Sequence, residues 1–221
     1  MTPRRTPAKR RASYHRGGLR KTLLDASLQL LETDGAPALS LREVARRAGV
    51  THGAPYYHFK DKQQLLDAIA EAGFAQLRDQ MIASRLLRAR ADERLAMIGR
   101  AYVRFALENR SCFQVMFRTD TAGAARGPAA AQAFQVMVEA VEAAQAEGLA
   151  PPGDPNLLVL LVWSAVHGLS SLWLSGALHP SGAEEPLGSP LAGQLSDLLA
   201  RLFALNGASE KSGPAPRAKR R

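Results

Sequence analysis

The sequence predicts an all-α protein of nine helices arranged in two domains. Apolar residues recur at intervals of three and four along most of the chain, and Gly, Pro and Asp are concentrated in the breaks between these stretches. The strict alternation of apolar and polar residues that marks strands is not found. We therefore expect a basic arm (1–18), a helix-turn-helix head (19–66), a helical body (67–206) and a basic tail (207–221).

The distribution of charge supports a head that is separate from the body. Residues 1–62 contain thirteen Lys or Arg against five Asp or Glu, a net charge of +8. Residues 63–206 have a net charge of −3, and residues 207–221 have a net charge of +4. A basic surface confined to one segment indicates a polyanionic partner for that segment.

The two ends of the chain combine Pro, Gly and basic residues without apolar periodicity, so we expect both to be disordered. No apolar core follows the N-terminal arginines, which argues against a signal peptide or anchor and favours a cytoplasmic location. The N-terminal arm follows phosphates or enters the adjacent minor groove, or it is a solubilising tail, and these alternatives remain open.

The head begins with a helix from about Leu19 to Thr33 that Gly35 ends. Ser40 and Glu43 then form the pattern of a capping box, in which the hydroxyl accepts a backbone N–H and the carboxylate reaches back to the cap. This short helix runs to Gly49, whose permissive backbone ends it.

A second short helix is predicted from about Thr51 to Phe59, with Pro55 in its first turn. Gly53 and Ala54 would let the start of this helix approach base edges closely, while the larger side chains around them reach the DNA backbone. The other interpretation of this segment is an αα-hairpin with a solvated basic face.

The segment GVTHGAPYYHFKDKQQLL, preceded by SLREVARRA, resembles the DNA-binding domain of the TetR family of transcriptional regulators. Pro55 stands where many members have Leu. The resemblance implies that the partner is double-stranded DNA with an inverted-repeat operator, and that Phe59 is a core residue. It implies DNA contacts by Arg42, Thr51, His52, Gly53, Ala54, Tyr56, Tyr57, His58 and Lys62, of which His58 and Lys62 would meet phosphates.

The body is predicted to be helical throughout. A long helix capped by Asp61 would run to about Leu87 and link the head to the body. The further helices are expected over Glu93–Glu108, Ser111–Phe117, Pro128–Glu147, Pro155–Leu178 and Leu187–Leu205.

The run Leu157–Leu178 has no charged residue and is long enough to span a membrane. Its serines dilute the apolarity, and a helix apolar on all sides can also be buried by a partner, so we predict a homodimer and no membrane contact. The last two helices would form the interface, with Trp173, Leu195, Leu198 and Leu202. The spacing of Trp163, His167 and Gly168 resembles the Trp-His-Gly C-terminal domain of some TetR regulators.

Aromatic and Met residues of the body are candidates for an effector pocket, although simple core packing must account for most of them. The candidates are Tyr102, Phe105, Phe113, Met116, Phe117, Met137, Trp163 and His167. Few polar groups accompany them, so the expected effector is a small, mainly apolar molecule. It would enter near Phe113, Phe117 and Trp163 and shift the helix that begins at Asp61.

Catalytic patterns are absent from the sequence. Cys112 is the only cysteine, the five histidines lack metal-ligand spacing, and no nucleotide-binding or nucleophile motif is found. We expect no enzyme activity, no cofactor and no metal site. The prediction is a DNA-binding regulator, a repressor that its ligand releases from DNA. An architectural DNA-binding protein, a helical enzyme and a single-span membrane protein remain as alternatives.

Overall fold

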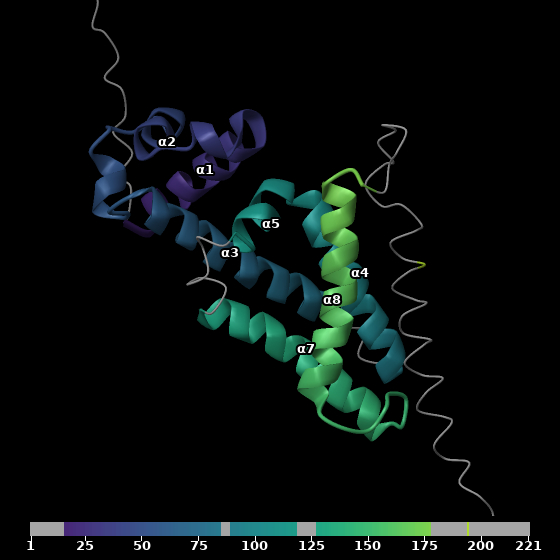
Figure 1. The fold of residues 1–221 in the computed structure, drawn as a ribbon. Helices are drawn as coiled ribbons and strands as arrows, with labels where there is room; N and C mark the ends of the chain where they lie inside the picture. The colour runs from purple at the N-terminus through teal and green to yellow at the C-terminus, as the bar shows by residue number, and fades with distance from the viewer. Residues whose placement is uncertain (1–15, 85–88, 119–126, 178–193, 195–221) are drawn as a thin grey trace, which may run out of the picture. The chain divides into compact units, whose positions relative to one another are not determined.

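The computed structural model describes residues 16–84, 89–118, 127–177 and 194. Within these ranges the chain forms seven α-helices and one 3₁₀ helix, labelled in Figure 1, and no strand. Contacts divide the chain into two units, Met1–Leu65 and Leu66–Arg221. We call their described residues the head (16–65) and the body (66–177). The predicted helix Leu187–Leu205, most of the arm and the tail lie outside the described residues.

The first helix of the head, α1 (Arg16–Ala38), buries an apolar face against α2 (Leu41–Arg47). Leu23 and Leu30 are almost completely buried in this contact region. Gly35 has φ 75° and ψ 175°, which interrupts the helix and kinks its last turn. The prediction that Gly35 ends the regular helix is therefore confirmed.

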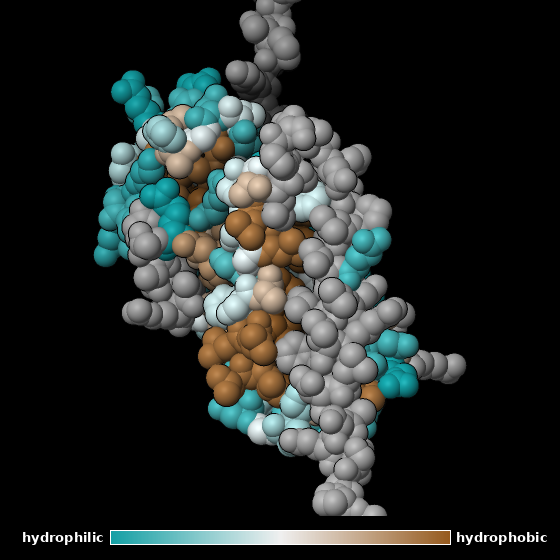
Figure 2. All heavy atoms as spheres, turned by 45° about the vertical axis from the view of Figure 1, so that its right-hand side comes forward, coloured by the Kyte–Doolittle hydropathy of each residue, from teal (hydrophilic) through white to brown (hydrophobic). Residues whose placement is uncertain are grey.

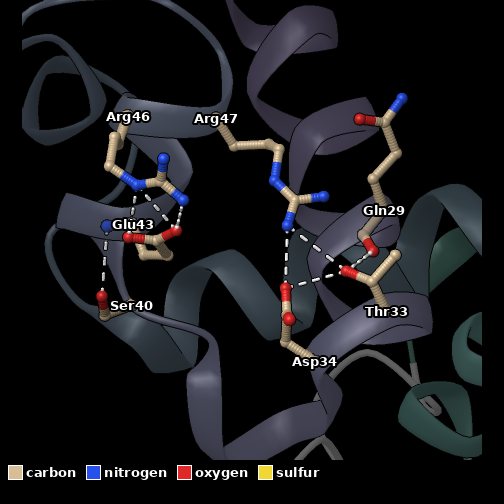
Figure 3. Close-up of polar contacts among 7 residues, drawn as sticks. All are labelled: Gln29, Thr33, Asp34, Ser40, Glu43, Arg46 and Arg47. Atoms are coloured by element: carbon tan, nitrogen blue, oxygen red, sulfur yellow. Dashed lines mark hydrogen bonds and ion pairs between the residues drawn. The ribbon is translucent and has the colours of Figure 1, made fainter.

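Ser40 caps α2, but only half of the predicted capping box forms (Figure 3). The Ser40 hydroxyl accepts the Glu43 N–H at 3.2 Å. The Glu43 carboxylate instead accepts hydrogen bonds from the Arg46 guanidinium, with both oxygens 2.9 Å from Nε. A bidentate hydrogen bond from a guanidinium to a carboxylate is stronger than one from a neutral backbone N–H. The hydrogen bond from Arg46 lowers the pKa of Glu43. Gly49, at φ 68°, ends the helix as predicted.

The predicted second helix of the motif is a four-residue 3₁₀ helix, η1 (Ala54–Tyr57). The prediction of an α-helix from Thr51 to Phe59 was therefore wrong in length and type. Pro55 has no N–H to donate, and short helical pieces favour the tighter i→i+3 bonds. The N–H groups of His58 and Phe59 both donate to the Pro55 carbonyl at 2.9 Å.

The long helix α3 (Lys62–Ala83) follows the motif directly. Asp61 caps it, since the Asp61 Oδ1 accepts the Gln64 N–H at 2.8 Å. The boundary between the two units falls within α3, after Leu65. The predicted end at Leu87 lies outside the described residues.

The body is built around α4 (Ala91–Glu108), which packs against α7 (Pro128–Ala146) and α8 (Pro155–Leu174). The short helix α5 (Arg110–Met116) follows α4. Tyr102 and Phe105 of α4 are among the most deeply buried side chains. α8 ends at Leu174 rather than at the predicted Leu178, because Gly176 adopts φ 77° and the Ala177 N–H turns back to the Leu172 carbonyl.

Candidate DNA-binding surface and effector pocket

The turn of the helix-turn-helix presents an exposed face over a buried anchor. Tyr56 and Tyr57 of η1 are 59% and 88% exposed, whereas Pro55 and Phe59 are buried. The predicted DNA contacts Thr51, His52 and Gly53 are also exposed, and Ala54 and His58 are half-buried. The buried residues therefore hold the turn in place while the neighbouring side chains remain available to a partner.

The basic side chains of the head differ in their hydrogen-bond and ion-pair partners. Arg46 is paired with Glu43, and Arg47 is paired with Asp34 of α1 at 2.8 Å, as Figure 3 shows. Arg42 is exposed on α2. The exposed Lys62 donates from Nζ to the Ala36 carbonyl at 2.9 Å, at the end of α1. Lys62 therefore has a structural partner besides the phosphate contact predicted for it.

The body contains an apolar pocket of about 300 Å³. Its walls come from α3, α4, α7, α8 and the residue that follows α5. The lining residues are Phe74, Leu77, Met81, Tyr102, Phe117, Ala130, Ala131, Ala133, Phe134, Met137 and Trp163. None of them is charged, so the pocket suits a ligand without a buried charge.

Three side chains from α4 and α8 form a polar group beside this pocket. Trp163 donates its Nε1–H to the Tyr102 hydroxyl oxygen at 3.0 Å, and that oxygen lies 2.9 Å from His167 Nδ1. Burial lowers the pKa of His167 and raises the pKa of the Tyr102 phenol, so both groups stay neutral near pH 7. The direction of the bond between Tyr102 and His167 depends on the histidine tautomer: with the proton on Nε2, Nδ1 accepts the Tyr102 proton.

Four of the eight predicted pocket residues line the pocket, and the other four do not. Tyr102, Phe117, Met137 and Trp163 line the pocket. His167 stands behind Tyr102, and the ring of Phe113 lies 4.9 Å from that of Phe117 and is itself buried. Phe105 and Met116 are completely buried. Phe105 and Met116 are therefore core residues, as the alternative of core packing predicted.

Several lining residues were not among the predicted ones. Phe74, Leu77 and Met81 lie on one face of α3, and their spacing of three and four was the available signal. That spacing is also what any packed helix face shows. The alanines of α7 gave no signal at all, because a small side chain is noticed only when the space beside it is known.

The outer face of α8 is apolar and exposed. Leu157, Leu160, Leu161 and Leu172 are between 47% and 66% exposed, and Figure 2 shows hydrophobic residues gathered on the side of the body that includes α8. Trp173 is half-buried, whereas the predicted interface residues Leu195, Leu198 and Leu202 lie outside the described residues. By length and composition α8 could cross a membrane, and only 17% of its most apolar window is buried.

No group of three His, Cys, Asp or Glu side chains among the described residues could hold a metal ion. Cys112 is buried near the Ile69 carbonyl, at 4.0 Å.

Comparison with known families gives two matches that lie side by side along the chain. Residues 23–69 match the family described as bacterial regulatory proteins, tetR family. Residues 95–191 match the family described as tetracyclin repressor-like, C-terminal domain, a range that includes Trp163, His167 and Gly168.

Individual relatives agree with these matches. The tetracycline repressor protein class A from transposon 1721 of Escherichia coli is 40% identical over 80 residues, which are 36% of this chain and 35% of that protein. The chain spans between 24% and 42% of the length of the first curated relatives it matches.

Solved structures extend the likeness over most of the chain. A protein of unknown function from Rhodococcus sp. RHA1 is 34% identical with a TM-score of 0.70, over 87% of this chain and 98% of its own. AibR in complex with isovaleryl coenzyme A and operator DNA has a TM-score of 0.58 at 20% identity, over 84% of this chain and 98% of its own. The second likeness concerns the fold alone.

Proposed function

The chain belongs to the TetR family of bacterial regulatory proteins, and from this we propose that it is a homodimeric repressor that a small, mainly apolar ligand releases from an inverted-repeat operator. The family consists of DNA-binding regulators, which confirms the prediction of a protein that is not an enzyme. The repressor acts in the cytoplasm, where it meets the chromosome.

The observation that supports DNA binding best is the exposed turn of the head. Its tyrosines protrude from a short element anchored by Pro55 and Phe59, next to exposed His52 and Gly53. In this proposal Arg42 and His52 read base edges, while the tyrosines, His58 and Lys62 hold phosphates. The small residues Gly53 and Ala54 at the start of η1 let the backbone itself come close to the groove.

The homodimer is supported by the uncovered apolar face of α8. Four leucines of this helix are about half or more exposed, and apolar side chains gathered on one exposed face are typical of an interaction surface. Because the C-terminal family match includes all of α8, we place this face against a second copy rather than in a membrane. Two heads about 34 to 36 Å apart would then fill successive major grooves.

The route from ligand to DNA is proposed to run through α3. The helix begins at Lys62, directly after the DNA-binding turn, and its residues Phe74, Leu77 and Met81 line the apolar pocket. A ligand that displaces these three side chains acts on the helix whose first residues belong to the head. A coupling of about 1 to 3 kcal/mol would lower operator affinity roughly 5- to 150-fold.

Footprinting on the DNA that flanks the gene tests DNA binding. Wild-type protein should protect a short inverted repeat, and His52→Ala should alter base preference within it. Asp25→Ala on exposed α1, which removes a side chain outside the turn, is the control and should leave the footprint unchanged. An architectural protein would instead coat the DNA without boundaries, and that outcome would end the proposal.

Sedimentation tests the dimer. Leu161→Glu places a charge on the α8 face and should convert a wild-type dimer into monomers, because the charge would be buried unpaired in both copies. Ile82→Glu is the matched control, since Ile82 is 48% exposed on α3 against 59% for Leu161. A wild-type chain that sediments as a monomer at micromolar concentration would refute this part.

A further inference from the structure

We infer that the ligand of the apolar pocket is a neutral, planar aromatic molecule of about two rings that carries one hydroxyl or N–H donor. This inference rests on the proposed function for its biological meaning. Its argument comes from the size of the pocket, the character of its walls and the hydrogen bonds of Tyr102.

The volume limits the size of the ligand. A cavity of about 150 Å³ holds one benzene molecule, so a pocket of about 300 Å³ accommodates roughly two such rings, on the order of ten to fourteen non-hydrogen atoms. A nucleotide-sized group is too large for this space.

The walls favour a flat aromatic ligand. Four rings of the lining contact one another in series: Phe74 meets Phe117 edge-on at 5.5 Å, Phe117 lies 6.3 Å from Trp163, and Trp163 meets Phe134 edge-on at 6.2 Å. Aromatic pairs prefer edge-to-face and offset arrangements, which a further ring inserted beside this series can continue. The small alanines of α7 leave the space into which that ring fits.

The hydrogen bonds of Tyr102 determine the polar group of the ligand. The Tyr102 oxygen accepts from Trp163 and lies 2.9 Å from His167 Nδ1. We assign to His167 the neutral tautomer with its proton on Nε2, in which Tyr102 donates its own proton to Nδ1. One lone pair of that oxygen remains, so a donor on the ligand is satisfied there and an acceptor is not. Since none of the described lining residues is a cation, a carboxylate in the pocket would be buried without a partner.

Calorimetric titration of the full chain at neutral pH with matched probes tests the ligand class. The probes are 2-naphthol, naphthalene, 2-methoxynaphthalene, 2-naphthoate and decahydro-2-naphthol, which keeps the skeleton and hydroxyl of 2-naphthol but is neither flat nor aromatic. We expect 2-naphthol to bind about 3- to 10-fold more tightly than naphthalene or 2-methoxynaphthalene. It should also bind about 3- to 10-fold more tightly than decahydro-2-naphthol, and 2-naphthoate should be weakest.

Two variants place the binding in the pocket. Tyr102→Phe should reduce the preference for 2-naphthol over naphthalene to about one. Any general disturbance of the pocket affects both probes and cancels in that ratio. Ala130→Leu fills part of the pocket and should weaken both probes, whereas Ala146→Leu, exposed at the other end of the same helix, should weaken neither.

The possible outcomes separate the ligand class from the regulatory role. If 2-naphthoate or decahydro-2-naphthol binds as well as 2-naphthol, or if Tyr102→Phe leaves the preference intact, the inference is overturned, while a footprint on the inverted repeat still supports the repressor. If the predicted ranking is found but the operator footprint is absent, the ligand class is supported and the proposed function fails.

Discussion

Replacing Lys62 by Met separates two roles that the sequence and the structure give to this side chain. The structure ties Nζ to the Ala36 carbonyl at 2.9 Å, at the end of α1. An ammonium group has three donors, so this bond leaves two of them for a phosphate. The variant should therefore lose both a support within the head and a DNA contact.

The two losses have different magnitudes and different signatures. Removing the bond to Ala36 from an exposed site should lower the free energy of unfolding by about 0.5 to 1.5 kcal/mol. Removing one phosphate contact should make the negative slope of log K against log salt concentration shallower by about 0.9. The affinity gap between wild type and variant should then narrow about 3.5-fold when salt rises from about 50 to about 200 mM.

Fluorescence anisotropy with operator and random duplexes at several salt concentrations measures the slope, and urea unfolding measures the stability. Lys21→Met is the matched control: it removes the same charge from an exposed lysine of the head, paired with Asp25 at 3.0 Å. We expect Lys62→Met to weaken both duplexes alike. A salt slope equal to that of Lys21→Met would show that Lys62 supports α1 and meets no phosphate.

Two further substitutions test the packing of the body. Gly73→Ala should lower the free energy of unfolding, measured in urea, by up to about 2 kcal/mol. A Cβ at this position would lie 2.6 Å from Met116 Sδ and 2.7 Å from Cys112 Sγ. The second substitution Cys112→Ala should therefore restore part of the lost stability. Glu147→Gln should lower the Tm at pH 7, because the Ala91 N–H and Arg94 stabilise the ionised carboxylate and lower the pKa of Glu147. The Tm difference should shrink as the pH falls from 4.5 through that lowered pKa, and a difference that stays constant over this range would contradict this account.

Much of the head could be predicted from the sequence, because the signals there act over a few residues. Ser40 and Asp61 cap helices through N–H groups three positions away, and Gly35 and Gly49 end helices through their own φ angles. Such features need no knowledge of the rest of the fold. The same locality explains the error at Pro55, where helical spacing outweighed the missing N–H and the shortness of the segment.

The pocket depended on distances that no local pattern contains. The sequence made Phe105, Phe117 and Trp163 candidates for the pocket, yet it could not show which of them pack tightly and which border a space. Phe105 is completely buried, while the other two line the pocket. The difference arises in part because three small alanines of α7 line the pocket beside Phe134 and Met137 and leave space there.

Polar partners divide in the same way between sequence and tertiary structure. The sequence showed that Ser40 could accept a hydrogen bond and that Lys62 carries a charge. The pairing of Glu43 with Arg46 and of Lys62 with the Ala36 carbonyl became evident only from the structure. The local chemistry of a side chain is encoded where it stands in the chain. Its partner is selected by the packing of segments that the chain brings together, and the free energy of that packing is a property of the whole fold.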